Sequence, residues 1–122
     1  MSIAARLSAV LITLVAASPA FPAVMYVHDS SGNLGTVDTA TGSASVIGNM
    51  GVQMTDIAFD PTGSLYGLSF TSLYSIDKIT GASSLIGAHG ISNGNALVFG
   101  KDGTLYGAGN TTTSLFALNT AT

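Results

Sequence analysis

A stretch that occurs twice decides the fold class of this chain. Phe59-Asp60-Pro61-Thr62-Gly63-Ser64-Leu65-Tyr66-Gly67 returns in modified form as Phe99-Gly100-Lys101-Asp102-Gly103-Thr104-Leu105-Tyr106-Gly107. Outside this stretch, Thr41-Gly42 returns at nearly the same spacing as Thr80-Gly81. A period of about 40 residues that contains several short strand patterns indicates an array of β-repeats.

Each repeat contains four short strand patterns separated by turn residues. The sequence predicts strands at 56–59, 65–70, 73–77 and 82–87, and a new unit that begins at 96–99. Proline fixes φ and glycine supplies a positive φ in the turns between them. Stretches 25–27 and 34–38 match the second and third strands of an earlier unit. We expect antiparallel pairing between consecutive strands of a unit, and no long helix after residue 23.

Large apolar side chains fall on both faces of the predicted strands. In the strand at 65–70, Leu65 points to one face, whereas Tyr66 and Leu68 point to the other. A sheet that is apolar on both faces must be covered on both, and radial stacking of four-stranded sheets achieves this. The sequence therefore predicts an all-β fold made of antiparallel four-stranded blades of a β-propeller, incomplete, with about two and a half repeats.

The segment 1–20 has the layout of a secretory signal peptide. Arg6 precedes an apolar run at 7–17, and small residues follow the run. Cleavage after Ala20 is favoured over cleavage after Ala23, because the later cut would place bulky Phe21 at a position that requires a small residue. An N-terminal core helix is the alternative. The pattern predicts a secreted or periplasmic protein, or one of the cell envelope.

The repeat domain, residues 24–122, has the pattern of a partial array. Asn119-Thr120-Ala121-Thr122 matches Asp38-Thr39-Ala40-Thr41, which is followed by the turn glycine Gly42. Propellers have at least about 4 blades, so we expect the remaining blades to belong to the same full-length chain. The alternative is a protomer of two blades that assembles with other copies into a closed ring.

The order of short motifs in each unit resembles a known family. Thr80-Gly81, Ile86-Gly87, Asp102-Gly103 and Leu105-Tyr106-Gly107 resemble the repeat of secreted bacterial β-propellers of the broad YVTN-like and quinoprotein-like superfamily. The resemblance implies a propeller and no particular activity, since that superfamily includes both enzymes and binding proteins. The chain has no tryptophan, which disfavours a quinone cofactor, and no Trp-Asp pair of the kind that marks WD40 repeats.

Composition excludes several classes of partner. The net charge is −3 and only 7% of residues are charged, so the chain lacks the basic surface that binds a phosphate backbone, and we expect no nucleic-acid partner. No apolar run after the N-terminal segment approaches the ~20 residues of a membrane-spanning helix. The absence of cysteine excludes disulfides and a lipid anchor on cysteine.

No catalytic motif is present in the sequence. The two histidines, His28 and His89, lie at the end of a predicted strand and in a long loop, so a metal site would need aspartates brought in by the fold. We interpret them as ordinary solvated histidines. Asp29-Ser30-Ser31-Gly32-Asn33 is interpreted as a turn, because it lacks the alternating ligands and terminal glutamate of a calcium loop. The sequence thus predicts no catalytic residue, no metal ligand and no cofactor.

The connections between units are the predicted binding surface. They join the last strand of one unit to the first strand of the next, and loops on a rigid scaffold can vary without disturbing its packing. The candidate binding residues are Gln53, Thr55, His89, Asn93 and Asn95. Their amides and hydroxyls suit a protein or glycan ligand. Two alternatives remain open: these residues serve only to form turns, or the chain is part of a lyase or hydrolase whose metal site is completed by further blades.

Overall fold

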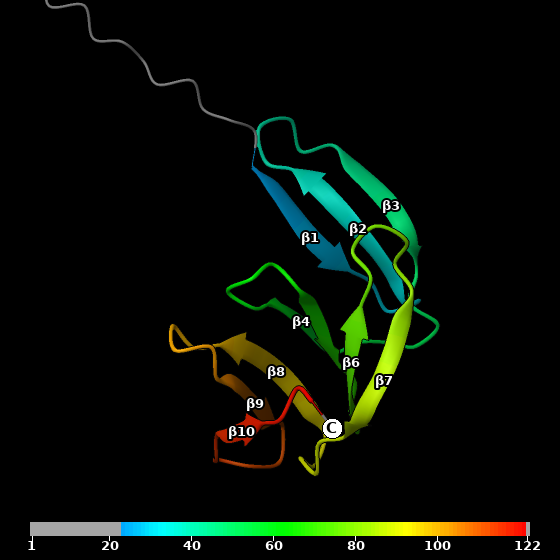
Figure 1. Ribbon diagram of the computed structural model, residues 1–122. Helices are drawn as coiled ribbons and strands as arrows, with labels where there is room; N and C mark the ends of the chain where they lie inside the picture. Colours follow the sequence, from blue (N-terminus) through cyan, green and yellow to red (C-terminus); the bar gives the residue numbers. More distant parts are fainter. Residues whose placement is uncertain (1–22, 122) are drawn as a thin grey trace, which may run out of the picture.

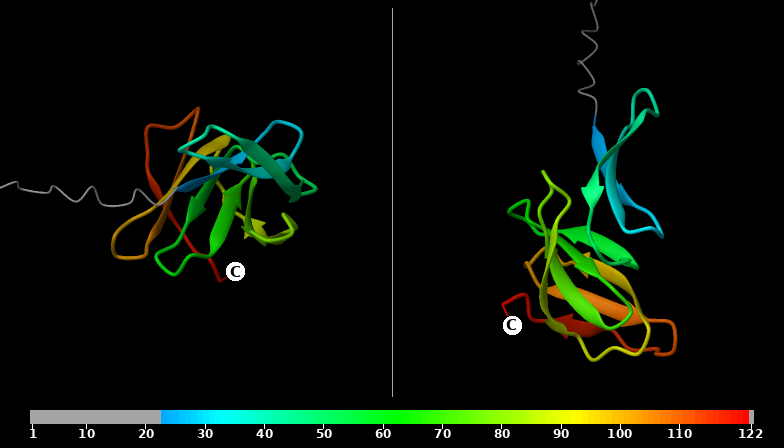
Figure 2. Two further views of the ribbon diagram at one scale, coloured as in Figure 1. Left: turned by 90° about the horizontal axis from the view of Figure 1, so that it is seen from above. Right: turned by 90° about the vertical axis from the view of Figure 1, so that its right-hand side faces the viewer.

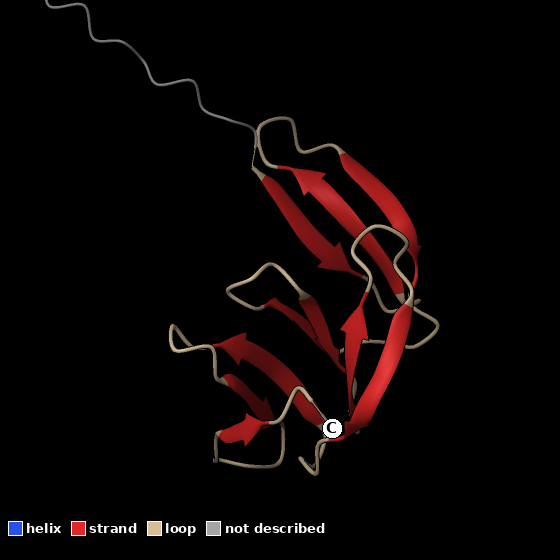
Figure 3. Ribbon diagram, viewed as in Figure 1, coloured by secondary structure: helices blue, strands red, loops and turns tan. Residues whose placement is uncertain are grey.

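The computed structural model describes residues 23–121, which fold into ten antiparallel strands (Figure 1). The all-β prediction is confirmed, and Figure 3 shows no helix in this range, hence none that could cross a membrane. The predicted signal peptide lies outside the described residues. The strands are β1 (Val24–His28), β2 (Asn33–Asp38), β3 (Ala44–Asn49), β4 (Asp56–Phe59), β5 (Leu65–Leu68), β6 (Ser72–Ile76), β7 (Ser83–Ala88), β8 (Gly94–Phe99), β9 (Leu105–Gly109) and β10 (Phe116–Leu118).

The strands form three consecutive sheets. The N-terminal sheet has the order β1-β2-β3, the central sheet β4-β5-β6-β7, and the C-terminal sheet β10-β9-β8. The predicted antiparallel pairings of the central sheet are present, with Ile57 opposite Gly67 and Leu65 opposite Ile76. Only this sheet has the four strands that the sequence predicts for a unit, and the others have three in the described residues. The sheets follow one another along an open arc and do not close into a ring (Figures 1 and 2).

Aspartate side chains hold the turns that connect the strands. Asp60 accepts hydrogen bonds from the backbone N–H of Thr62 at 2.9 Å and of Ser64 at 2.8 Å. Asp77 does the same for Ile79 at 2.8 Å and Thr80 at 3.2 Å. Aspartate favours turns because its short side chain can bond the backbone two or more residues on. The sequence positions of the turns could therefore be read directly from these residues.

We expect the stability of the protein to fall in acid because of these turns. Donation from the Ser64 N–H lowers the pKa of Asp60 below its ordinary value of 3.8, and the Ile79 N–H does so for the pKa of Asp77. A pKa that is lower in the folded state gives a stabilisation that is present above the unfolded pKa and lost as the pH falls through the folded pKa. The midpoint temperature of thermal unfolding should therefore decrease as the pH is lowered below about 4. Circular dichroism at a series of pH values from about pH 6 to about pH 2.5 measures this decrease.

The variant Asp60→Asn, whose side chain does not titrate, should make this drop shallower. If the midpoint of Asp60→Asn and that of Asp77→Asn both fell in acid as steeply as the midpoint of the unaltered chain, the assignment of the acid sensitivity to these turns would be contradicted.

The apolar core consists of two clusters, one between each pair of neighbouring sheets. The first joins the N-terminal and central sheets and contains Leu34, Met50, Met54, Leu65 and Ile76. The second joins the central and C-terminal sheets and contains Leu68, Leu73, Leu97 and Leu105. Because strand side chains alternate between faces, β5 contributes Leu65 to one cluster and Leu68 to the other. The central sheet is thus covered on both faces, as its two-sided apolar pattern predicts.

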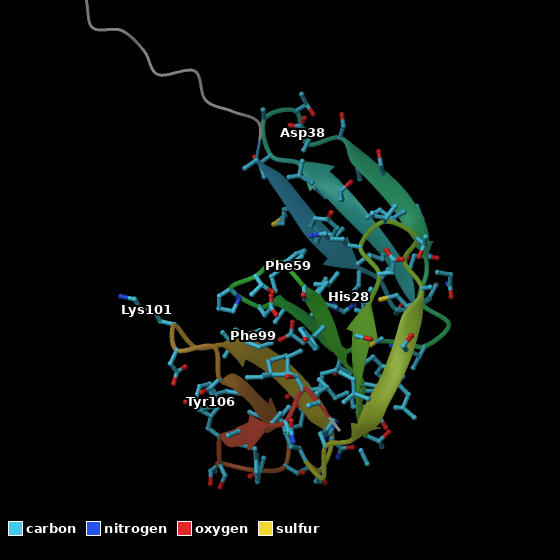
Figure 4. The ribbon with its side chains drawn as sticks, viewed as in Figure 1. His28, Asp38, Phe59, Phe99, Lys101 and Tyr106 are labelled. Carbon is cyan, nitrogen blue, oxygen red and sulfur yellow. The ribbon has the colours of Figure 1, made fainter. Side chains whose placement is uncertain are left out.

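Aromatic pairs lie across both sheet interfaces. The ring of Phe59 meets that of Tyr26 edge-on at a centroid distance of 5.0 Å, and Phe99 lies 5.3 Å from Tyr66. Figure 4 shows Phe59 at the side of β4 that faces β1, and Phe99 between β8 and the central sheet. Such pairs add to the stabilisation that comes from buried area. They fix how neighbouring sheets are positioned.

Specific polar contacts also join the sheets. The Asp56 carboxylate in β4 accepts a hydrogen bond from the Leu97 N–H in β8 at 2.7 Å. The Ser83 hydroxyl in β7 donates to the Met50 carbonyl at 2.6 Å. At the outer end of the first interface the backbone of Gly48 lies directly against Thr80 and Gly81. These contacts place the loops at the strand ends in a defined arrangement.

The outer faces of the two end sheets expose large apolar side chains. In the N-terminal sheet, Met25 is 52% exposed and Val46 is 73% exposed. In the C-terminal sheet, Val98 is 57% exposed, and Leu115, directly before β10, is 65% exposed. Tyr106 lies on the far side of the C-terminal sheet (Figure 4), although Tyr66, which has the matching place in the central sheet, packs on Phe99. The central sheet is covered on both faces, whereas each end sheet is covered only on the face that it turns toward the central sheet.

Candidate functional site

Loops from all three sheets converge on one shallow hollow of about 370 Å³. They meet there because β1, β5 and β9 end, and β4 and β8 begin, at the same end of the molecule. The hollow is lined by His28, Asp29, Ser30, Gln53, Met54, Thr55, Phe70, Asn95 and Asn110. Three of the five predicted binding residues are in this set: Gln53, Thr55 and Asn95. The other two, His89 and Asn93, do not line it.

Thr55 has a structural role in addition to its place in the hollow. Its hydroxyl lies 2.9 Å from the Leu68 carbonyl and 2.8 Å from the Gly94 carbonyl, so it bridges the central and C-terminal sheets. A carbonyl can only accept, so the hydroxyl hydrogen is used internally and Thr55 offers a ligand only its oxygen lone pairs.

The amides of the hollow have more capacity for a ligand. The Asn95 side-chain nitrogen donates to the side-chain oxygen of Asn110, and both residues line the hollow, so the Asn95 oxygen remains as an acceptor and the Asn110 nitrogen as a donor. Gln53 is exposed and its amide has no hydrogen-bonding partner within residues 23–121. Phe70 is 46% exposed at the same place. The site therefore presents uncharged hydrogen-bonding groups beside an apolar ring.

His89 is bound into its own loop and is not a solvated histidine as the sequence suggested. Its Nε2 lies 3.0 Å from the Ser69 carbonyl and its Nδ1 lies 3.0 Å from the Ile91 N–H. A carbonyl requires a donor and an N–H requires an acceptor, so Nε2 donates and Nδ1 accepts in these two contacts. The ring also packs on Gly94, where an added Cβ would lie 2.8 Å from it. His89 thus shapes the connection between β7 and β8.

Asn93 is a turn residue. Its φ of 50° lies in the left-handed region, which asparagine tolerates better than most residues. Its carbonyl accepts a hydrogen bond from the Asn110 N–H at 3.1 Å. Asn93 contributes to the hollow only by holding the loop that carries Asn110.

Asp29 adds a negative charge to the rim of the hollow. The Asn33 side chain donates to its carboxylate at 2.9 Å, as do the backbone N–H groups of Ser31 and Asn33. The Asn33 side-chain bond is the main reason that the pKa of Asp29 is lowered. The interpretation of this segment as a turn is consistent with these bonds, since the carboxylate is occupied by the backbone of its own turn.

Ser30, Phe70 and Asn110 line the hollow but are not among the binding residues that the sequence predicts. These residues occupy one position in three successive units, shortly after the second strand of each. Thr55 and Asn95 likewise share one position of the repeat, 40 residues apart, at the start of the first strand of each unit. The available signal was the repeat itself, because residues that share a position in successive units lie at the same end of their sheets.

Within residues 23–121 the structure does not gather metal-binding side chains. No group of three or more histidine, cysteine, aspartate or glutamate residues that could hold a metal ion occurs in the described part of the chain. The Nδ1 atom of His28 is buried and has no hydrogen-bonding partner there. The arrangement in the hollow can bind through hydrogen bonds and ring contact.

Comparison with known proteins corrects the family suggested by the sequence motifs. No family model and no curated protein matches the chain. It is similar to a solved structure described by the words "The de novo evolutionary emergence of a symmetrical protein is shaped by folding constraints", with 22% identity and a TM-score of 0.54. The match covers 77% of this chain and 46% of that chain. At this identity the likeness shows the fold alone.

The resemblance to secreted bacterial β-propellers of the YVTN-like and quinoprotein-like superfamily is therefore wrong as a family assignment. Nothing among family models supports it, and the similar structure is described as a symmetrical protein that emerged de novo. Short motifs such as Thr80-Gly81 and Leu105-Tyr106-Gly107 serve turns and strand packing, so the physics of antiparallel sheets alone selects them. They do not identify ancestry.

Proposed function

We propose that this chain is a non-catalytic interaction module that binds a glycan in the hollow at the end of its three sheets. The observation that carries the proposal is the convergence of Gln53, Asn95 and Phe70 from separate loops on a packed scaffold. Loops fixed by a rigid framework are where binding residues are commonly found.

The chemistry of the hollow fits a sugar. Each sugar hydroxyl both donates and accepts hydrogen bonds, and an amide offers both functions side by side. The C–H face of a sugar ring is apolar and can cover an exposed aromatic ring such as Phe70. The charge of Asp29 at the rim disfavours an acidic sugar. A neutral glycan is therefore the best match.

The proposal includes the finer architecture and the location. The three sheets act as blades of an incomplete propeller, and the open apolar faces around Met25 and Val98 support further sheets of the same kind covering them. The signal-peptide pattern of segment 1–20 supports secretion or a place in the cell envelope, where glycans are available.

We expect binding to neutral oligosaccharides to depend on the hollow and on no other surface. The full chain would be screened on a glycan array, and hits would be titrated by calorimetry. Phe70→Ala and Asn95→Ala should each weaken binding by about 10-fold, the loss expected for one ring contact or one to two hydrogen bonds. Leu85→Ala and Ser84→Ala, both exposed on β7, serve as controls and should leave binding unchanged.

Two results would contradict this function. One is an array without any bound neutral glycan. The other is a bound glycan whose affinity is the same for Phe70→Ala and Asn95→Ala as for the unaltered chain. Chemical conversion of the glycan during the titration would show that the module is catalytic.

A further inference from the structure

The first strand of the N-terminal sheet has a free edge beside an apolar groove. Within residues 23–121, β1 pairs with β2 only. The strands that correspond to β1 in the other two sheets are β5 and β9. At the edge that is free in β1, β5 pairs with β4 and β9 pairs with β8. Along the free edge of β1 the structure has a groove of about 290 Å³ lined by Val24, Met25, Tyr26, Ile57, Ala58, Phe59 and Leu65.

The pairs β4–β5 and β8–β9 in the other two sheets show which kind of strand fits beside β1. β4 lies antiparallel to β5, with Phe59 opposite Leu65 and Ala58 opposite Tyr66. β8 lies antiparallel to β9 in the same way, with Phe99 opposite Leu105 and Val98 opposite Tyr106. β8 also contacts β4, the first strand of the sheet before it. A strand on the edge of β1 would likewise pair with β1 and contact β4.

We propose that the free edge of β1 binds an extended apolar segment of a partner protein, which adds to the N-terminal sheet as a fourth, antiparallel strand. An unpaired edge offers a row of backbone N–H and C=O groups, and strand addition is a common mode of peptide recognition. The edge of β1 carries Val24, which is 58% exposed, and Met25, so it has no charged side chain to prevent pairing.

Side-chain pockets set the sequence of the partner segment. Its residue opposite Tyr26 enters the groove against Ile57 and Phe59, so it must be apolar and of small to medium size. Its residue opposite Met25 takes the place that Phe59 and Phe99 have in the complete sheets, and a large apolar side chain suits it.

The end of β1 adds a polar preference. His28 closes the strand, and its buried Nδ1 has no partner in the described residues. The residue of β4 at the corresponding position, opposite Leu68, is Asp56. An aspartate in the partner at this position would accept a hydrogen bond from a protonated Nδ1. The preferred segment therefore has the order aspartate, any residue, small to medium apolar, large apolar, opposite His28, Val27, Tyr26 and Met25 in turn.

A synthetic peptide with the sequence of residues 53–61 provides the test, because it contains this order in Asp56-Ile57-Ala58-Phe59. A fluorescent form would be titrated with the full chain and followed by anisotropy. We expect saturable binding, and slower hydrogen exchange of the β1 amides in the complex. A peptide N-methylated at its central residues keeps the side chains and loses backbone donors, so it should bind at least about 10-fold more weakly.

Matched lysine variants locate the site on the host. Val24→Lys places a charge at the rim of the groove, where lysine blocks edge pairing, and should weaken peptide binding by about 10-fold or more. Val46→Lys places the same charge on β3, at the other edge of the same sheet, and should leave binding unchanged. Both positions are exposed, at 58% and 73%, so both variants should fold.

Three results would overturn the proposal: no binding of the peptide at millimolar host concentration, equal binding of the N-methylated peptide, or equal binding by Val24→Lys. Self-association of the full chain that Val24→Lys abolishes would show that the edge serves a second copy and would overturn the assignment to a different partner protein. Neither readout measures glycan binding, and Val24 lies at the other end of β1 from His28, the residue of this strand that lines the hollow.

Discussion

Replacing Gly81 with alanine is expected to destabilise the protein far more than the same change at Gly42. Both glycines close equivalent turns with a positive φ, 78° and 74°. A Cβ at Gly42 would have no heavy atom within 4 Å, whereas at Gly81 it would lie 2.9 Å from the carbonyl carbon of Gly48 and 3.0 Å from its Cα. These are backbone atoms, so only separation of the N-terminal and central sheets can relieve the overlap.

Comparing the free energies of unfolding of Gly42→Ala and Gly81→Ala separates the cost of backbone strain from the cost of this overlap. Gly42→Ala carries only the cost of a left-handed alanine, about 1–2 kcal/mol. Gly81→Ala carries this cost and the disruption of the interface, in total about 4–5 kcal/mol, a large part of the ~5–15 kcal/mol of a typical domain. Urea denaturation of both variants measures the difference. Equal losses would mean that the sheets do not meet at Gly48.

Leu68→Ala is expected to have the second largest effect. The Leu68 side chain is fully buried, with 0% exposure, between the central and C-terminal sheets. Removing three carbon atoms there loses transfer free energy and leaves a cavity, at a cost of about 2–5 kcal/mol. The same substitution at Leu85, which is 65% exposed on β7, should change stability by no more than about 0.5 kcal/mol.

Thermal unfolding and urea denaturation would both report this contrast. Similar losses for Leu68→Ala and Leu85→Ala would indicate that the second cluster does not form between the sheets in solution.

Much of the fold could be predicted because its signals are local. Asp60 and Asp77 mark turns through bonds to residues two to four positions away, and the alternation in β5 assigns Leu65 and Leu68 to opposite faces. Such information lies within a short window of sequence. How neighbouring sheets meet is different, since the approach of Gly48 to Thr80 joins segments that belong to different sheets and lie far apart in the sequence.

The candidate site shows the same division. Thr55 and Asn95 could be predicted because they are polar residues in or beside the connections between units. Phe70 was missed because an aromatic residue at a strand end is also expected in packing, and only the arrangement of three sheets leaves it 46% exposed. His89 was misjudged because its partner, the Ser69 carbonyl, belongs to an earlier loop that only the folded chain brings beside it.

The order of the sheets has a consequence for how the molecule opens. Within residues 23–121, strands of the N-terminal sheet contact only the central sheet, and so do those of the C-terminal sheet. The molecule is therefore a linear series of units coupled to nearest neighbours, in which stability is a sum over units and junctions. Either terminal unit can detach while the rest stays folded, so amides of β1 and β10 should exchange with solvent through partial openings and those of β5 mainly through global unfolding.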